Sequence, residues 1–158
     1  MRGIIDTVPA VPAYLSGLRL SGRRVVVIGA GRVAERRLDR LLEAGAELIV
    51  IAPVATELIK QLADSGRLTW LQRGYLYGDL EGAWYALVAT DDHDCNERVS
   101  TEAEQRRIFC VRSDDRQAAT AWTPASAVTD GVQIGVLAGG DHGRSRRIRD
   151  ELLRQLDL

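Results

Sequence analysis

Short apolar runs alternate with stretches of helical periodicity along most of this sequence, and this alternation constrains the fold more than any other feature. Runs such as Arg24–Ile28 (RVVVI) and residues 47–52 (ELIVIA) are rich in β-branched residues, which is typical of strands buried on both faces. Between them, residues 32–44 carry apolar side chains at helical spacing, and Gly45 follows as the residue that ends the helix. Strands and helices that alternate in this way form βαβ units.

The same pattern continues toward the C-terminus. Further strands are predicted at residues 68–71, 84–90, 108–111 and 132–137, and further helices at residues 54–64, 94–106 and 144–156. Because crossovers between parallel strands are right-handed, these units predict an α/β fold: a doubly wound parallel sheet with helices on both faces and a short C-terminal helical extension. A chain of 158 residues has room for one ordinary domain of this kind.

Composition and charge narrow the classes of partner. The formal net charge of −1 disfavours a nucleic-acid partner that is bound by bulk electrostatics. No run approaches the ~20 apolar residues of a membrane helix, and Pro9 and Pro12 interrupt the N-terminal segment, so we expect neither a membrane span nor a secretory signal. Cys95 and Cys110 match neither a disulfide framework nor a metal motif, and we expect buried, reduced thiols in a cytoplasmic protein.

A glycine-rich turn joins the first predicted strand to the first predicted helix. Residues 29–34 (GAGRVA) match the pattern G-x-G-x-x-A. Gly29 allows the sharp turn, Gly31 lets a pyrophosphate approach the backbone, and Ala34 is small enough for the helix to pack against the strand. The N–H groups that open the helix then face the phosphates. In this position the motif predicts a Rossmann-type dinucleotide-binding domain, and the alternative is a turn whose glycines serve packing alone.

The second predicted strand lacks the acidic residue that usually follows it in this fold and binds the adenosine ribose. Ile51-Ala52-Pro53 occupies that position, with neither an acid nor an arginine. We therefore expect the ribose to be held by backbone groups around Pro53 and Val54, or by groups elsewhere in the chain. Because no arginine is present for a 2′-phosphate, the sequence favours NAD over NADP.

Three stretches resemble one enzyme family. The segments GAGRVAERRLDRLLEAGAELIVIAP and ALVATDDHDCNERVSTEAEQRRIFCVRSDD are similar to the NAD-binding part of siroheme synthases and single-domain precorrin-2 dehydrogenases, which also lack the acidic residue after the second strand. A third segment, read loosely from Ile134 (IGVLAGGDHGRSRRIRDELL), continues the resemblance in the same order. The resemblance runs from about Tyr14 to the C-terminus.

The resemblance implies an oxidoreductase that converts the tetrapyrrole precorrin-2 to sirohydrochlorin with NAD, a step in siroheme biosynthesis. Many members of the family also insert ferrous iron, so sirohydrochlorin ferrochelatase activity is a further implication. The family's proteins are homodimers. Residues 1–113 then correspond to the NAD-binding Rossmann domain, and residues 114–158 to the end of the sheet and the start of a dimerisation and substrate region that continues further in other members.

Site residues follow from the same resemblance. The family's catalytic Asp comes shortly after the fifth strand and falls on Asp114, with Asp115 as the alternative one position along. A carboxylate at the carboxyl end of a parallel strand stands where such sheets bind ligands and can act as a general base, whereas the plain alternative is an Asx turn. The expected NAD contacts lie on the glycine-rich turn and after the second and fourth strands: Gly29, Gly31, Arg32, Val33, Pro53, Val54, Thr90 and Asp91.

Other charged groups leave alternatives open. Residues 91–94 (DDHD) are contiguous and cannot all point to one metal ion without strain, and Asp92 or Asp94 can cap the next helix instead, so we expect no metal site. Six late arginines could bind substrate carboxylates, form a solvated helix face or contact a dimer mate: Arg112, Arg116, Arg144, Arg146, Arg147 and Arg149. The alternative function is an NAD-binding regulatory or ligand-sensing module without catalysis.

Overall fold

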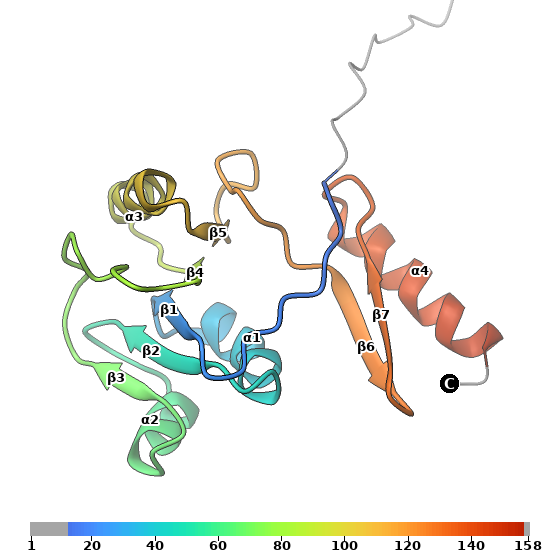
Figure 1. Cartoon of the computed structure of the whole chain (residues 1–158), viewed down its shortest axis with the longest axis horizontal. Helices are drawn as coiled ribbons and strands as arrows, with labels where there is room; N and C mark the ends of the chain where they lie inside the picture. Colours follow the sequence, from blue (N-terminus) through green and yellow to red (C-terminus); the bar gives the residue numbers. More distant parts are fainter. Residues whose placement is uncertain (1–12, 157–158) are drawn as a thin grey trace, which may run out of the picture. The chain divides into compact units, whose positions relative to one another are not determined.

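The computed structural model describes residues 13–156 and contains a five-stranded parallel sheet (Figure 1). In chain order its strands are β1 (Arg24–Ile28), β2 (Glu47–Ile51), β3 (Thr69–Leu71), β4 (Tyr85–Val88) and β5 (Phe109–Arg112). They lie in the order β3-β2-β1-β4-β5, so the chain begins in the middle, builds outward to one edge and then returns to build the other half. The predicted doubly wound parallel sheet is confirmed.

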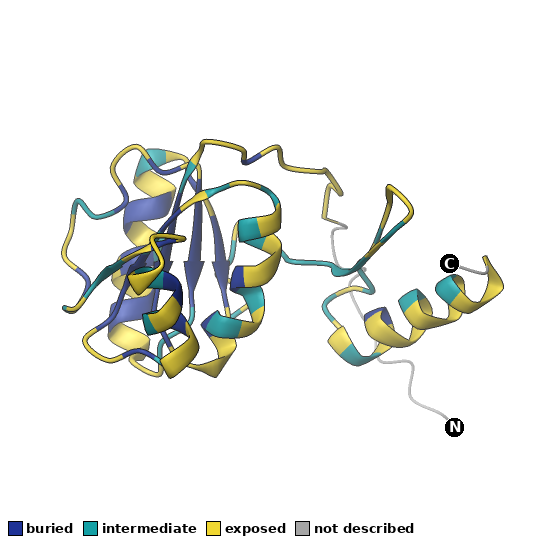
Figure 2. Ribbon diagram, turned by 90° about the horizontal axis from the view of Figure 1, so that it is seen from below, coloured by how far each residue is buried: buried dark blue, intermediate teal, exposed yellow. Residues whose placement is uncertain are grey.

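Three helices cover the sheet, and Figure 2 shows them on both sides of its buried strands. They are α1 (Arg32–Glu43), α2 (Glu57–Asp64) and α3 (His93–Arg106). Side chains of β1 alternate between the two faces, as they must in a strand. Val25 and Val27 belong to the core that includes residues of α1 and α2, whereas Val26 and Ile28 belong to the core that includes residues of α3.

Most element ends agree with the sequence pattern to within one or two residues. Gly45 follows α1 with a φ of +73°, a left-handed conformation that glycine adopts at little cost because it has no Cβ. The second helix begins at Glu57, three residues later than predicted, because residues 53–56 form a loop in which the Thr56 N–H donates to the Ala30 carbonyl at 3.0 Å. Cys95 and Cys110 are buried free thiols, as expected.

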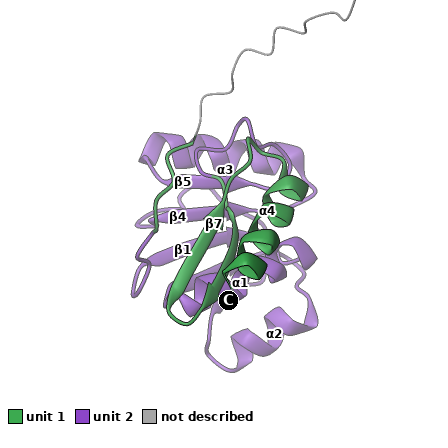
Figure 3. Ribbon diagram, turned by 90° about the vertical axis from the view of Figure 1, so that its right-hand side faces the viewer, with its two compact units in different colours: residues 1–17, 122–158 green, residues 18–121 purple. Residues whose placement is uncertain are grey.

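The described residues divide into two compact units, one of residues 18–121 and one of residues 13–17 with 122–156 (Figure 3). In the second unit, β6 (Ala125–Thr129) pairs antiparallel with β7 (Val132–Val136), and α4 (His142–Gln155) packs on this hairpin. The sequence pattern predicted a strand at 132–137 as the end of the parallel sheet, and this placement is wrong. That strand instead pairs with β6, which the pattern did not predict.

The reason for the difference lies in the turn between the two strands. Asp130 and Gly131 have φ values of +47° and +78°, which is the conformation of a two-residue hairpin turn and is favoured by the sequence Asp-Gly. A turn of this kind brings the following strand back antiparallel beside the preceding one. No helix in the described part of the chain is long and apolar enough to cross a membrane.

Candidate functional site

The glycine-rich turn lies at the carboxyl ends of the central strands, where the chain reverses the direction in which it builds the sheet. Gly29 has a φ of +99°, and its N–H donates to the Ile51 carbonyl at 2.9 Å. A Cβ at this position would lie 2.4 Å from the Ala89 carbonyl oxygen and 3.1 Å from the Thr90 methyl carbon. Gly29 therefore allows the ends of β1 and β4 to approach each other, at the place where open α/β sheets bind ligands.

Gly31 has a different role. It precedes α1 in an extended conformation, and no side chain caps the helix. A Cβ at Gly31 would meet no atom within 4 Å, so the space beside the helix N-terminus is open. Arg32 and Val33 are exposed on the first turn, while Ala34 is fully buried beneath it. Uncapped N–H groups beside open space suit the phosphates of a dinucleotide.

The loop after β2 borders the same turn. The hydrogen bond from Thr56 N–H to the Ala30 carbonyl ties this loop to the glycine-rich turn. Pro53 is exposed and Val54 is 75% exposed, so an apolar surface lies next to the predicted phosphate site. The Ala52 carbonyl already accepts a hydrogen bond from the Trp70 indole N–H at 2.9 Å, which leaves backbone groups further along the loop for a ribose.

After β4, the side chains of Thr90 and Asp92 make hydrogen bonds within the chain. The Thr90 hydroxyl lies 2.5 Å from Asn96 Oδ1 and accepts a hydrogen bond from the Asp92 N–H at 3.1 Å. Asp92 caps α3 by accepting from the Cys95 N–H at 2.9 Å, which decides the question of the cap in favour of Asp92. Asp91 is exposed and forms part of the loop that follows the strand.

Asp114 follows β5 and lies in a charged cluster. Arg112 donates two hydrogen bonds to its carboxylate, from Nε at 3.1 Å and from Nη2 at 2.8 Å. His93, the first residue of α3, places Nδ1 3.0 Å from Asp114 Oδ2. The Arg112 guanidinium, assisted by Asn96 and His93, holds the pKa of the Asp114 carboxyl well below its usual range against an opposing desolvation effect. Asp114 is thus an ionised carboxylate at neutral pH.

The Arg112 side chain is fully buried, and its N–H groups donate hydrogen bonds to other residues of the chain. Besides the Asp114 carboxylate, its Nη1 contacts Glu97 at 2.6 Å and Ser100 at 3.1 Å. The hydrogen bonds to Asp114 and then to Glu97 raise the pKa of Arg112 above its ordinary value, against an opposing desolvation effect. Among the arginines considered for substrate carboxylates, Arg112 is therefore better described as the residue that positions Asp114.

Asp115, the alternative to Asp114, makes the Asx turn that was one interpretation of this region. Its Oδ1 accepts from the Gln117 N–H at 2.8 Å and from the Ala118 N–H at 3.3 Å. Its carboxylate is thereby used to shape the loop. The two neighbouring aspartates differ in that only Asp114 contacts a histidine and a buried arginine.

The sequence pattern missed the pairing of His93 with Asp114. The two residues are 21 positions apart, and no local motif connects them. The available signal was topological: β4 and β5 are neighbouring parallel strands, so the residues that follow them meet at one edge of the sheet. Within the described residues, no group of three or more metal-binding side chains comes together.

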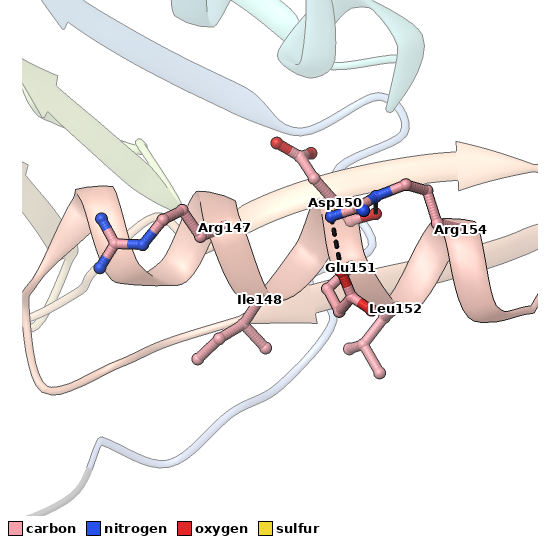
Figure 4. Close-up of a pocket in the computed structure, with 6 residues that line it drawn as sticks. All are labelled: Arg147, Ile148, Asp150, Glu151, Leu152 and Arg154. Carbon is pink, nitrogen blue, oxygen red and sulfur yellow. Dashed lines mark hydrogen bonds and ion pairs between the residues drawn. The ribbon is translucent and has the colours of Figure 1, made fainter.

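The remaining late arginines belong to the other compact unit or to the loop after β5. Arg144, Arg146 and Arg147 are exposed on α4, and Arg149 pairs with the adjacent Asp150 at 2.7 Å. Figure 4 shows an open depression along this helix and the ion pair between Arg154 and Glu151. The residues that line it are Arg147, Ile148, Asp150, Glu151, Leu152 and Arg154.

Comparisons with known proteins agree with this geometry. The siroheme synthases of Citrobacter koseri and of Escherichia coli O1:K1 are each 36% identical to this chain over 138 residues, which is 87% of the chain. The chain spans only 30% of the length of these relatives. Among solved structures, "SirC, precorrin-2 dehydrogenase" superposes with a TM-score of 0.80 at 25% identity, over 90% of this chain and 71% of that one.

A family described as "Putative NAD(P)-binding" matches residues 17–125. The matched segment covers more than half of the chain and contains the glycine-rich turn, the loop after β2 and the cluster around Asp114. The dinucleotide-binding domain predicted from the turn is confirmed, and so is the nicotinamide dinucleotide as its class of cofactor. This chain belongs to that NAD(P)-binding family.

Proposed function

We propose that this chain carries the NAD-dependent dehydrogenation of precorrin-2 to sirohydrochlorin in siroheme biosynthesis. The observation that carries the proposal is the set of groups at the carboxyl ends of strands β1, β2, β4 and β5: an uncapped glycine-rich helix start, an apolar loop, and the ionised Asp114 in contact with His93. A dinucleotide site and groups able to manage a proton are the two things a dehydrogenase requires. The similarity to siroheme synthases and to a precorrin-2 dehydrogenase supports the choice of substrate.

The residues available at this edge fit a dinucleotide. The pyrophosphate would lie at the start of α1 against Gly29, Gly31, Arg32 and Val33, because a side chain is missing where the phosphates must approach. The ribose and adenine would contact Pro53 and Val54, and the nicotinamide half would lie toward Thr90 and Asp91. Bound NAD would supply the acceptor for the two electrons that leave the substrate. The absence of an arginine directly after β2 favours NAD over NADP.

Asp114 has a place in this proposal as a catalytic-site residue at the carboxyl end of β5. Its ionised carboxylate keeps a fixed negative charge at the edge of the sheet, and Arg112 holds the carboxylate in one orientation. The same hydrogen bonds stabilise the ionised form, so Asp114 has little tendency to take up a proton at neutral pH.

We further propose that the protein is a cytoplasmic homodimer. In the described part of the smaller unit, Ser145 is the only buried residue, so the hairpin and α4 do not enclose an apolar core of their own (Figure 2). Ile148 and Leu152 on α4, and Leu156 at its C-cap, are spaced four residues apart and are all exposed. Such a stripe is the kind of surface that a second copy of the chain would cover. Leu152→Arg should then reduce the mass measured by light scattering from that of a dimer to that of a monomer.

One experiment distinguishes the proposed dehydrogenase from the alternative, a regulatory module without catalysis. The chain is mixed with precorrin-2 and NAD under anaerobic conditions, and sirohydrochlorin is followed by its absorbance together with the formation of NADH. The proposal predicts that both products appear in equal amounts. If NAD raises the melting temperature but neither product forms, the chain binds the cofactor without this reaction, and the regulatory alternative holds.

A further inference from the structure

We propose that His93, positioned by Asp114, accepts the proton that leaves the substrate during dehydrogenation. The inference rests on the proposed function and adds the identity of the base. It comes from a contact that joins the start of α3 to the loop after β5, at the edge of the sheet that carries the dinucleotide turn.

The geometry assigns different roles to the two ring nitrogens of His93. Nδ1 lies 3.0 Å from Asp114 Oδ2. An ionised carboxylate can only accept hydrogen bonds, so Nδ1 carries the hydrogen and donates it. In the neutral ring, Nε2 then has a free lone pair. The side chain of His93 is 72% exposed, which leaves the ring accessible to a ligand at this edge.

Asp114 is the poorer candidate for the base. Its carboxylate accepts two hydrogen bonds from Arg112, whose own side chain has no exposed surface. A proton on Asp114 would remove one of the two carboxylate charges that pair with this buried guanidinium, and weakening the pairing of a buried charge is costly. The depressed pKa of Asp114 expresses the same preference for the ionised form. A proton taken by His93 instead creates an imidazolium beside an intact carboxylate.

The step balances as follows. The substrate loses two protons and two electrons in all. One hydrogen would leave with both electrons of its bond, as a hydride for which bound NAD would be the acceptor. The other leaves as a proton that bonds to His93 Nε2, and the electron pair of its broken bond stays in the substrate as part of the new double bond. The resulting imidazolium is stabilised by Asp114 and later returns its proton to water. This division of roles, with a carboxylate that orients a histidine and stabilises its charged form, is an established way to make a histidine an effective base.

The charged groups around His93 come from three segments. Asp114 contacts the ring directly from the loop after β5, and Arg112 stands behind Asp114 at the end of that strand. Asp92 and Asp94 are its neighbours along the chain, and Asp92 is occupied with the helix cap. Glu97, one turn further along α3, pairs with Arg112. Asp114 is therefore the carboxylate that acts on the ring, and the arginine limits how freely it moves.

A first test needs neither substrate nor cofactor. The chain has two histidines, so nitrogen NMR spectra of the imidazole rings can be assigned by comparing the native chain with His93→Gln. The inference predicts that neutral His93 carries its hydrogen on Nδ1 and that this preference disappears in Asp114→Ala, with folding checked by circular dichroism. A native His93 that carries its hydrogen on Nε2 would overturn the inference.

The second test measures turnover. His93→Gln should lower the rate of sirohydrochlorin formation by about 10²-fold, the usual effect of losing a general base, while calorimetric NAD affinity stays unchanged. His142→Gln, which removes the other histidine, serves as the control and should keep the native rate. Native turnover in His93→Gln would overturn the role of His93 and leave the proposed function intact. No turnover in the native chain would instead overturn the proposed function and, with it, this inference.

Discussion

Replacing Gly29 with alanine should destabilise the larger unit of the protein far more than the same change at Gly31. At Gly29 the backbone has a φ of +99°, which costs a residue with a side chain about 1–3 kcal/mol. The new Cβ would also lie 2.4 Å from the Ala89 carbonyl oxygen and 2.7 Å from its carbon, both of them backbone atoms that move only with β4. Overpacking of this kind costs about 1–3 kcal/mol more.

The sum, about 2–6 kcal/mol, is a large fraction of the 5–15 kcal/mol that stabilises a typical domain. Urea unfolding followed by far-ultraviolet circular dichroism measures the loss, and at a slope of about 1–3 kcal/mol per molar urea the midpoint should fall by at least about 0.7 M. Gly31→Ala is the matched control, because its Cβ enters open space at an extended backbone. A Gly29→Ala midpoint equal to that of the control would refute the argument from close approach.

Three further predictions follow from the same edge of the sheet. Gly31→Asp should abolish calorimetric binding of NAD, because a carboxylate would stand against the pyrophosphate, while Gly74→Asp, another open position, should bind normally; equal affinities would disprove the assigned phosphate site. Asp114→Ala should reduce precorrin-2 oxidation by about 10²-fold, because the carboxylate that orients the base His93 is lost, and Asp115→Ala should have little effect; a large loss only in the second variant would give this orienting role to Asp115. Ionised Asp114 stabilises the fold at pH values above its ordinary pKa of 3.8, and this contribution is lost as the pH falls below that value toward the depressed pKa of the folded state. The difference in unfolding free energy between the native chain and Asp114→Asn should therefore shrink in acid, and a difference that stays constant with pH would contradict this prediction.

Several elements were predictable because their signals are local. The run Arg24–Ile28 has the composition of a buried strand, and β1 has those same bounds. Gly45 was identified as the end of α1 from its position after the last apolar residue, and its positive φ confirms the physical reason. The late start of α2 was harder to predict from the sequence, because it depends on a hydrogen bond between Thr56 and Ala30, which lie in two separate turns.

The hairpin of β6 and β7 has a local sequence signal in its turn. Asp130-Gly131 is a strong turn sequence, but β6 has few large apolar residues and its side chains are only partly buried. A strand without a clear alternation of apolar and polar residues is hard to distinguish from a loop. The following strand was therefore predicted correctly as a strand and assigned to the wrong sheet.

The sequence by itself determined the α/β class, the parallel sheet and the glycine-rich turn, because strand composition, helical spacing and the need for glycine are properties of neighbouring residues. Only the tertiary structure decided which residues Asp114 contacts. Its partners Arg112 and His93 lie on β5 and at the start of α3, and the contact between His93 and Asp114 exists because β4 and β5 are adjacent in the sheet. Strand order brings distant residues to the same end of the sheet, and the Arg112 guanidinium then keeps the Asp114 carboxylate ionised.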